Sequence, residues 1–120
     1  MPTLRDHLAR FIAIPGVRVV VLTGRDGLAI DAAGRGDQRL FEALGALGAS
    51  ALGTADALGQ DLGGSATVGA LLEYNNGLVS VDPLGEYAAL VTLMENAASL
   101  GRLRQALAAG RAELLRALDA

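Results

Sequence analysis

Residues 16–34 read GVRVVVLTGRDGLAIDAAG and are the most informative part of the sequence. Residues 17–23 form a β-branched run, and residues 28–33 form a second apolar run. The triplet RDG at positions 25–27 separates the two runs. Asp-Gly in this position is a strong signal of a β-hairpin, because both residues tolerate a positive φ angle. The stretch therefore predicts a strand, a tight turn and a second strand.

A helix with very little charge is expected directly after the hairpin. Residues 40–62 carry three charged side chains, those of Glu42, Asp56 and Asp61. Asp37 is well placed to cap the N-terminus of this helix, and a Gly-Gly pair at 63–64 is well placed to end it. An exposed surface helix carries more charge than this. The composition therefore favours a helix that contacts a second subunit in addition to its own core.

Two stripes run along this helix at 3.6 residues per turn. The first is an expected core stripe, made of Leu40, Leu44, Leu47, Ala51, Leu58 and Leu62. The second lies about a quarter turn away, and its members are Phe41, Gly45, Gly48, Leu52, Ala55 and Gly59. Each interior glycine costs a helix about 1 kcal/mol relative to alanine. We therefore expect the second stripe to pack closely against a helix of a second subunit; drift in an alanine- and glycine-rich genome is the alternative.

The remaining pattern predicts two helices and three strands. A first helix is expected at residues 4–14, capped by Thr3 and Asp6 and ended by a Pro-Gly pair. Strands are expected at residues 66–73, 78–81 and 87–94, separated by turns at 75–77 and 82–85. A last helix is expected at residues 97–118, with Asn96 or Ser99 as its cap.

The resulting order is helix, strand, strand, helix, strand, strand, strand, helix. It predicts one α+β domain over residues 1–120, with a five-stranded, mostly antiparallel sheet and helices on both faces. The strand at residues 66–72 has no charge, proline or bulge to protect it at a sheet edge. An unprotected edge is expected to pair with another strand. The candidates for a subunit contact here are Ala66, Thr67, Val68, Gly69, Ala70 and Leu71.

The composition argues against several classes of function. The net charge is −3 and there is no basic cluster, which argues against a nucleic-acid partner. No apolar run reaches the roughly 18 residues of a membrane span, so direct membrane insertion is not expected. The absence of cysteine is compatible with a cytoplasmic chain. His7 is the sole histidine, and the segment GGSATVG lacks the Lys-Ser/Thr of a phosphate-binding loop. We therefore expect no catalytic residue, cofactor or metal site.

The chain resembles the Roadblock family of dynein light chains and bacterial regulators, its bacterial MglB-like members in particular. The likeness rests on the strand, GRDG turn and strand at residues 17–33 and on the alanine- and leucine-rich helix at 40–62. It also rests on Gly-Leu-Val at 77–79, on the strand at 88–94 and on residues 97–107, which contain Leu-Gly at 100–101. The order and spacing of these motifs cover residues 4–115.

The resemblance implies a profilin-like domain that forms a homodimer by pairing its third strands, with the central helices side by side. It also implies a non-enzymatic regulator or scaffold that binds a small Ras-like GTPase, either modulating its GTP hydrolysis or serving as a partner. Candidate residues for contact with that partner are Arg25, Asp26 and Glu42. Two alternatives remain open: a dimeric adaptor in a signalling or motor assembly without GTPase recognition, and a sensor of small ligands.

Overall fold

The structure contains three helices and five strands within the described residues. The computed structural model describes residues 2–119, so positions 1 and 120 of the expected domain lie outside it. The element order agrees with the expectation. The elements are α1 (Leu4–Ile12), β1 (Val17–Gly24), β2 (Ala29–Gly34), α2 (Gln38–Asp61), β3 (Ala70–Tyr74), β4 (Gly77–Leu84), β5 (Ala88–Met94) and α3 (Ala98–Asp119).

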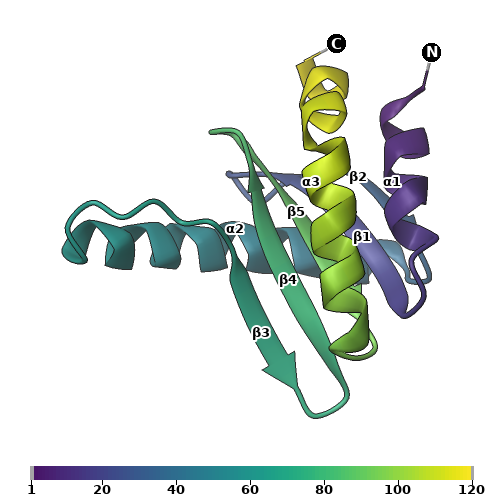
Figure 1. Cartoon of the computed structure of the whole chain (residues 1–120), viewed down its shortest axis with the longest axis horizontal. Coiled ribbons are helices and arrows are strands. Elements are labelled where there is room, and N and C mark those ends of the chain that lie inside the picture. Colours follow the sequence, from purple (N-terminus) through teal and green to yellow (C-terminus); the bar gives the residue numbers. More distant parts are fainter. Residues whose placement is uncertain (1, 120) are drawn as a thin grey trace.

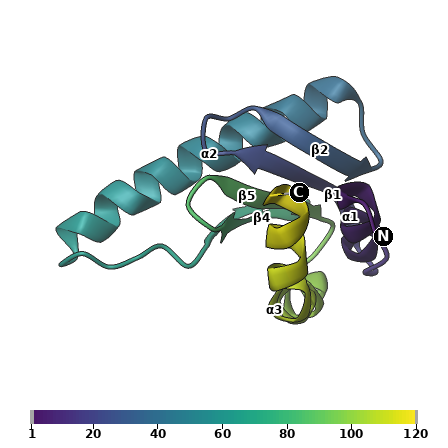
Figure 2. The same cartoon turned by 90° about the horizontal axis from the view of Figure 1, so that it is seen from above.

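The five strands form one antiparallel sheet in the order β2-β1-β5-β4-β3. Helix α2 crosses one face of the sheet, and α1 and α3 lie on the other (Figures 1 and 2). The expected α+β fold, with a five-stranded antiparallel sheet and helices on both faces, is therefore confirmed. The order leaves β2 and β3 as the two edge strands.

Each face of the sheet has its own core. The core under α2 contains Val19, Val21, Leu44, Leu52, Val79, Val81, Ala89 and Val91. The core under α1 and α3 includes Leu8, Phe11, Val20, Leu22, Leu90, Met94 and Leu103. Strands β1 and β5 are central and are buried on both faces, which explains why their sequences are apolar without alternation. No helix within residues 2–119 combines the length and hydropathy that a membrane span requires.

The β1–β2 turn differs in conformation from the expected one. Gly27 N–H donates to the Gly24 carbonyl (3.0 Å), and Gly24 N–H donates to the Leu28 carbonyl (3.0 Å). Gly27 has a φ of +88°, whereas no non-glycine residue in the described part of the chain has a positive φ. The expectation of a positive φ at both residues of Asp-Gly is therefore wrong for Asp26. The turn is centred on Arg25 and Asp26, and Gly27 follows it in the left-handed region.

The expected caps of the helices are largely confirmed. Thr3 and Asp6 form a capping box at α1. Asp37 Oδ1 accepts a hydrogen bond from Leu40 N–H at 2.9 Å at the start of α2. For α3 the sequence left two candidates, and Asn96 Oδ1 accepts from Ala98 N–H at 3.0 Å. Ser99 instead donates its hydroxyl to the Pro15 carbonyl at 2.6 Å, and so connects α3 to the turn between α1 and β1.

Two strand boundaries differ from the expectation. Strand β3 begins at Ala70 rather than at position 66, and β4 continues to Leu84 through three residues that were expected in a turn. Pairing between β3 and β4 stops at Ala70 and Val81. Pro83 therefore lies beyond the end of β3, where its missing N–H interrupts no ladder on that side. Ala66, Thr67, Val68 and Gly69 belong to a linker and not to a strand.

Candidate interaction surface

Helix α2 is longer than the sheet that it crosses. Its 24 residues extend over about 36 Å at 1.5 Å per residue, whereas five strands span only about 19 Å. Figure 1 shows its C-terminal part running past β3. Residues 53–61 form this part, which we call the α2 overhang. Leu58 is 58% exposed, and Leu62 directly after the helix is 67% exposed. The assignment of these two leucines to the core stripe is therefore wrong.

The small-residue stripe faces this chain's own sheet. A Cβ added at Gly48 would overlap the Cγ2 methyl of Val91, and one at Gly45 would lie 3.2 Å from Thr23 Oγ1. Leu52 is fully buried in the core under α2. The glycines therefore allow the helix backbone to approach the sheet closely. The interpretation of Gly45, Gly48 and Leu52 as a contact with a second subunit is wrong.

The other members of the stripe are also turned toward this chain. Phe41 and Ala55 are half-buried, and Phe41 packs against the core under α2. Gly59 is buried because the chain returns over it, and an added Cβ there would overlap the carbonyl oxygen of Ser65. The stripe does mark a close approach to the helix backbone, because this approach explains the glycines. The surface that they approach is intramolecular.

Residues 62–69 form the α2–β3 linker, which doubles back along α2 (Figures 1 and 2). Gly63 and Gly64 have φ angles of +89° and +82°, which L side chains rarely adopt. Ser65 N–H then donates to the Gly59 carbonyl at 2.9 Å. Val68, further along the linker, is 87% exposed. The glycine pair thus ends the helix as expected and returns the chain to the edge of the sheet.

Asp56 joins the overhang to the linker and to the β1–β2 turn. Its Oδ1 accepts a hydrogen bond from Thr67 Oγ1 at 2.6 Å, and its Oδ2 is 2.9 Å from Arg25 Nη1. The hydrogen bond from Thr67, followed by that from Arg25, lowers the pKa of the Asp56 carboxyl. These contacts hold the linker against α2, which explains why Thr67 does not extend β3.

Strand β3 has a neighbouring strand on one side only. Ala70 and Leu72 pack toward the core under α2, while Leu71 is 40% exposed on the opposite face. Five of the large exposed hydrophobic residues come from the overhang, the linker and β3: Leu58, Leu62, Val68, Leu71 and Tyr74. We call these three segments together the β3 surface. The sequence predicted β3 but not the exposure of Leu58 and Leu62. The length of the predicted helix was a sign that part of it would extend beyond the sheet.

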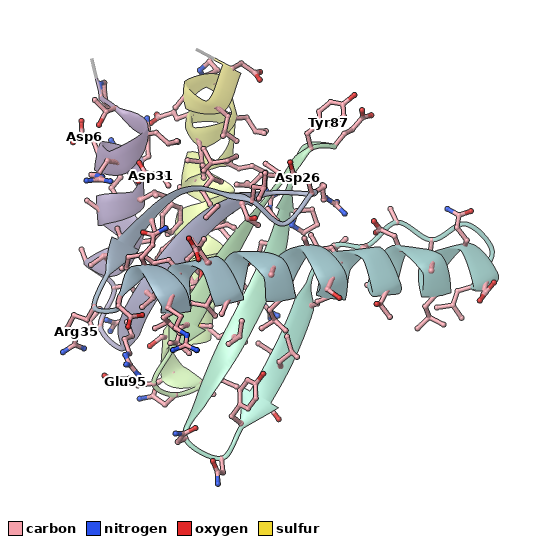
Figure 3. All side chains as sticks on the ribbon, turned by 180° about the vertical axis from the view of Figure 1, so that it is seen from behind. Asp6, Asp26, Asp31, Arg35, Tyr87 and Glu95 are labelled. Atoms are coloured by element: carbon pink, nitrogen blue, oxygen red, sulfur yellow. The ribbon has the colours of Figure 1, made fainter. Side chains whose placement is uncertain are left out.

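The three residues expected to contact a different partner have different surroundings. Arg25 is half-buried and paired with Asp56, so its side chain is already engaged within the chain. Asp26 is exposed, and its Oδ1 accepts from Leu28 N–H at 3.0 Å; Figure 3 shows it at the end of the hairpin. Glu42 is exposed on α2 and accepts a hydrogen bond from Gln38 at 3.4 Å. Asp26 and Glu42 therefore remain available at the surface.

A hollow of about 340 Å³ lies between β3 and α3. Ser80 Oγ donates to Asp82 Oδ2 at 3.0 Å on its floor, and Arg104 of α3 forms part of its wall. Burial raises the pKa of the Asp82 carboxyl despite this hydrogen bond and the nearby arginines. Residues 2–119 contain no cluster of three or more histidine or carboxylate side chains able to hold a metal ion.

The protein is a small α+β domain with five large exposed hydrophobic residues on or beside an open sheet edge. The family model of the Roadblock/LC7 domain matches residues 3–94, from the residue before α1 to the end of β5. The chain belongs to the Roadblock/LC7 family. Helix α3 follows the matched region.

Solved structures show the same fold. MglB of Myxococcus xanthus has 21% sequence identity and a TM-score of 0.85, with 97% of this chain and 94% of that chain covered. The gliding protein MglB of Thermus thermophilus has 22% identity and a TM-score of 0.84, with 98% and 90% covered. An MglB with a tetrameric arrangement has 22% identity and a TM-score of 0.83, with 95% and 86% covered. No curated protein matches the chain.

Proposed function

We propose that this chain is a non-enzymatic, cytoplasmic regulator or adaptor that forms a homodimer through the β3 surface and binds a small Ras-like GTPase. The main support for the dimer is the overhang of α2, which holds Leu58 in solvent. It lies beside the edge strand β3, in which the residues before Glu73 are uncharged. Membership of the Roadblock/LC7 family supports a regulatory or adaptor role.

The geometry favours pairing of two β3 strands across a two-fold axis. Such a contact is isologous, because each copy offers the same strand edge to the other. An overhang that passes the edge of its own sheet would then lie over the sheet of the second copy. Burial of Leu58 and Leu62 there stabilises the dimer by roughly 25 cal/mol for each Å² of apolar surface removed from water. The tetrameric arrangement of the similar MglB supports assembly of this fold into oligomers.

The proposed interface therefore differs from the one expected from the sequence. It keeps Ala70 and Leu71 as strand residues, and it keeps Ala66, Thr67, Val68 and Gly69 as linker residues that border the strand. It replaces the small-residue stripe by Leu58 and Leu62 of the α2 region. Glu42 and Asp26 lie outside this surface and are the remaining candidates for contact with a GTPase.

The dimer is tested by the solution mass from light scattering, at two concentrations about tenfold apart. Wild-type protein is expected to have the mass of a dimer, and Leu58→Glu that of a monomer, because the new carboxylate would be buried without a cation in the interface. Ala43→Glu is the matched control, since Ala43 is an exposed helix residue on the half of α2 that lies over the sheet. A monomeric wild type, or a dimeric Leu58→Glu, would contradict the proposal.

GTPase binding is tested by calorimetry with purified Ras-like GTPases from the same genome, loaded with GDP or with a GTP analogue. Binding in one nucleotide state, weakened by Glu42→Arg, is the expected result. A stable dimer that binds none of these GTPases in either state would instead favour the dimeric adaptor.

A further inference from the structure

The β1–β2 and β4–β5 hairpin turns meet at one end of the sheet. Arg25 N–H in the β1–β2 turn donates to the carbonyl of Tyr87 in the β4–β5 turn at 2.8 Å. Figure 3 shows Asp26 and Tyr87 at this end, with the tyrosine side chain projecting away from the rest of the chain. The last turns of α3 complete the same end, because Leu115 and Leu118 lie beside residues of the β4–β5 turn.

A bulge in β2 turns an additional apolar side chain toward α3. Leu22 pairs with Asp31 and Thr23 pairs with Ala29, so Ile30 has no partner residue on β1. An extra residue of this kind re-aims its side chain relative to a regular strand. Ile30 is 50% exposed and lines the same hollow as Leu115 and Leu118. The bulge therefore leaves the Ile30 side chain half exposed in this hollow instead of burying it in a core.

These elements enclose a hollow of about 410 Å³, which we call the end hollow. Its apolar lining comes from a β2 residue, β4, β5 and α3: Ile30, Leu84, Ala88, Leu115 and Leu118. Tyr87, 81% exposed, stands at its rim. The charged residues of the lining are both acidic, Glu86 and Asp119, and no arginine contributes to it.

The pattern of an apolar floor with an acidic rim specifies the chemistry of an occupant. An aliphatic side chain fits the floor, and an arginine or lysine beside it complements the two carboxylates. The exposed face of Tyr87 offers the same cation a cation–π contact. A second copy of this chain is disfavoured, because a symmetric contact would bring Glu86 and Asp119 of both copies together, and like charges repel.

We propose that the end hollow is a docking site for a segment of a partner protein that inserts an aliphatic side chain next to an arginine or lysine. The site shares no residue with the β3 surface. The inference is therefore independent of the proposed dimer.

The probe is a phage library of random linear peptides, selected on the wild-type protein. Enriched peptides are expected to carry Leu, Ile, Val or Met adjacent to Arg or Lys. The most enriched peptide, synthesised and measured by fluorescence anisotropy, is expected to bind Tyr87→Ser and Glu86→Arg at least about tenfold more weakly than wild type. Both side chains are exposed, and circular dichroism verifies that the variants are folded.

Tyr74→Ser is the matched control, because Tyr74 is the other tyrosine of the chain and is 52% exposed on β3. It is expected to bind the peptide as wild type does. Four results would overturn the proposal: no enrichment, enriched peptides without a basic residue, equal affinity for Tyr87→Ser and wild type, or equal losses in Tyr87→Ser and Tyr74→Ser. A change in the solution mass on Tyr87→Ser would also overturn it, since a second copy would then occupy the hollow.

Discussion

The two parts of α2, residues 38–52 and 53–61, both contain leucine, alanine and glycine, but their surroundings differ. Residues 38–52 lie over the sheet, and their buried positions are Leu44, Gly45, Gly48 and Leu52. Residues 53–61 extend past β3, and there Leu58 is exposed while Gly59 is covered only by the returning linker. Residue type alone therefore does not determine whether a leucine or a glycine of this helix is buried. Its role depends on whether the sheet lies beneath it.

The glycines of the two parts differ most clearly in the space around them. A Cβ at Gly48 would overlap Val91, whereas one at Gly53 would find no atom within 4 Å. Both positions are in the interior of the same helix, so their intrinsic cost to helix formation is similar. Alanine at the two sites should therefore change stability in opposite directions.

The largest effect is expected for Gly48→Ala. The added methyl forces α2 away from β5 or displaces Val91, and overpacking of this kind costs roughly 1–3 kcal/mol. Urea unfolding, followed by circular dichroism at a fixed protein concentration, measures the change. An unchanged or increased free energy of unfolding would show that α2 has room above the sheet, contrary to the described packing.

A smaller gain is expected for Gly53→Ala. The substitution meets no steric obstacle within the chain, and alanine favours a helix interior by roughly 0.5–1 kcal/mol over glycine. The same urea titration should show a higher free energy of unfolding than wild type. A loss in the dimer, with a gain in a monomeric Leu58→Glu background, would indicate that a second copy covers Gly53.

The smallest effect is expected for Asp56→Asn, and it depends on pH. Asp56 connects the overhang to the linker and hairpin turn, and hydrogen bonds from Thr67 and Arg25 lower its pKa below its ordinary value of 3.8. A carboxyl whose pKa is lowered by folding stabilises the folded state above its unfolded pKa, and this contribution is lost as the pH falls through the folded pKa. Wild type should exceed Asp56→Asn in stability at neutral pH. The difference should shrink below pH 3.8; a difference that is independent of pH would contradict the assignment.

Local features of the fold were predictable from the sequence. The hairpin at residues 16–34, the Asp37 cap and the Gly63-Gly64 termination depend on residues within a few positions of one another, so their signals are contained in short windows. Even here one conformational detail was wrong, since Asp26 has a negative φ in the turn. The element order and the antiparallel sheet followed from these local signals.

The candidate surface was predictable only in part. The open edge of β3 followed from a segment without charge or proline, but its first residue did not, because Thr67 bonds to Asp56 eleven positions earlier in the chain. The sequence also could not show whether the small-residue stripe faces this chain's own sheet or a second subunit. Periodicity defines two faces of a helix and does not state which of them another backbone approaches.

The order of the elements, their caps and turns, and the presence of a close-packed face on α2 were therefore all encoded locally in the sequence. These properties depend on intrinsic backbone preferences and on contacts between neighbouring residues. Three other properties became visible in the folded chain: this face packs on its own sheet, Leu58 and Leu62 remain exposed, and Ile30 lines a hollow with α3. Each of these depends on lengths and registers of segments far apart in the chain, since a helix of about 36 Å cannot be covered by a sheet about 19 Å wide.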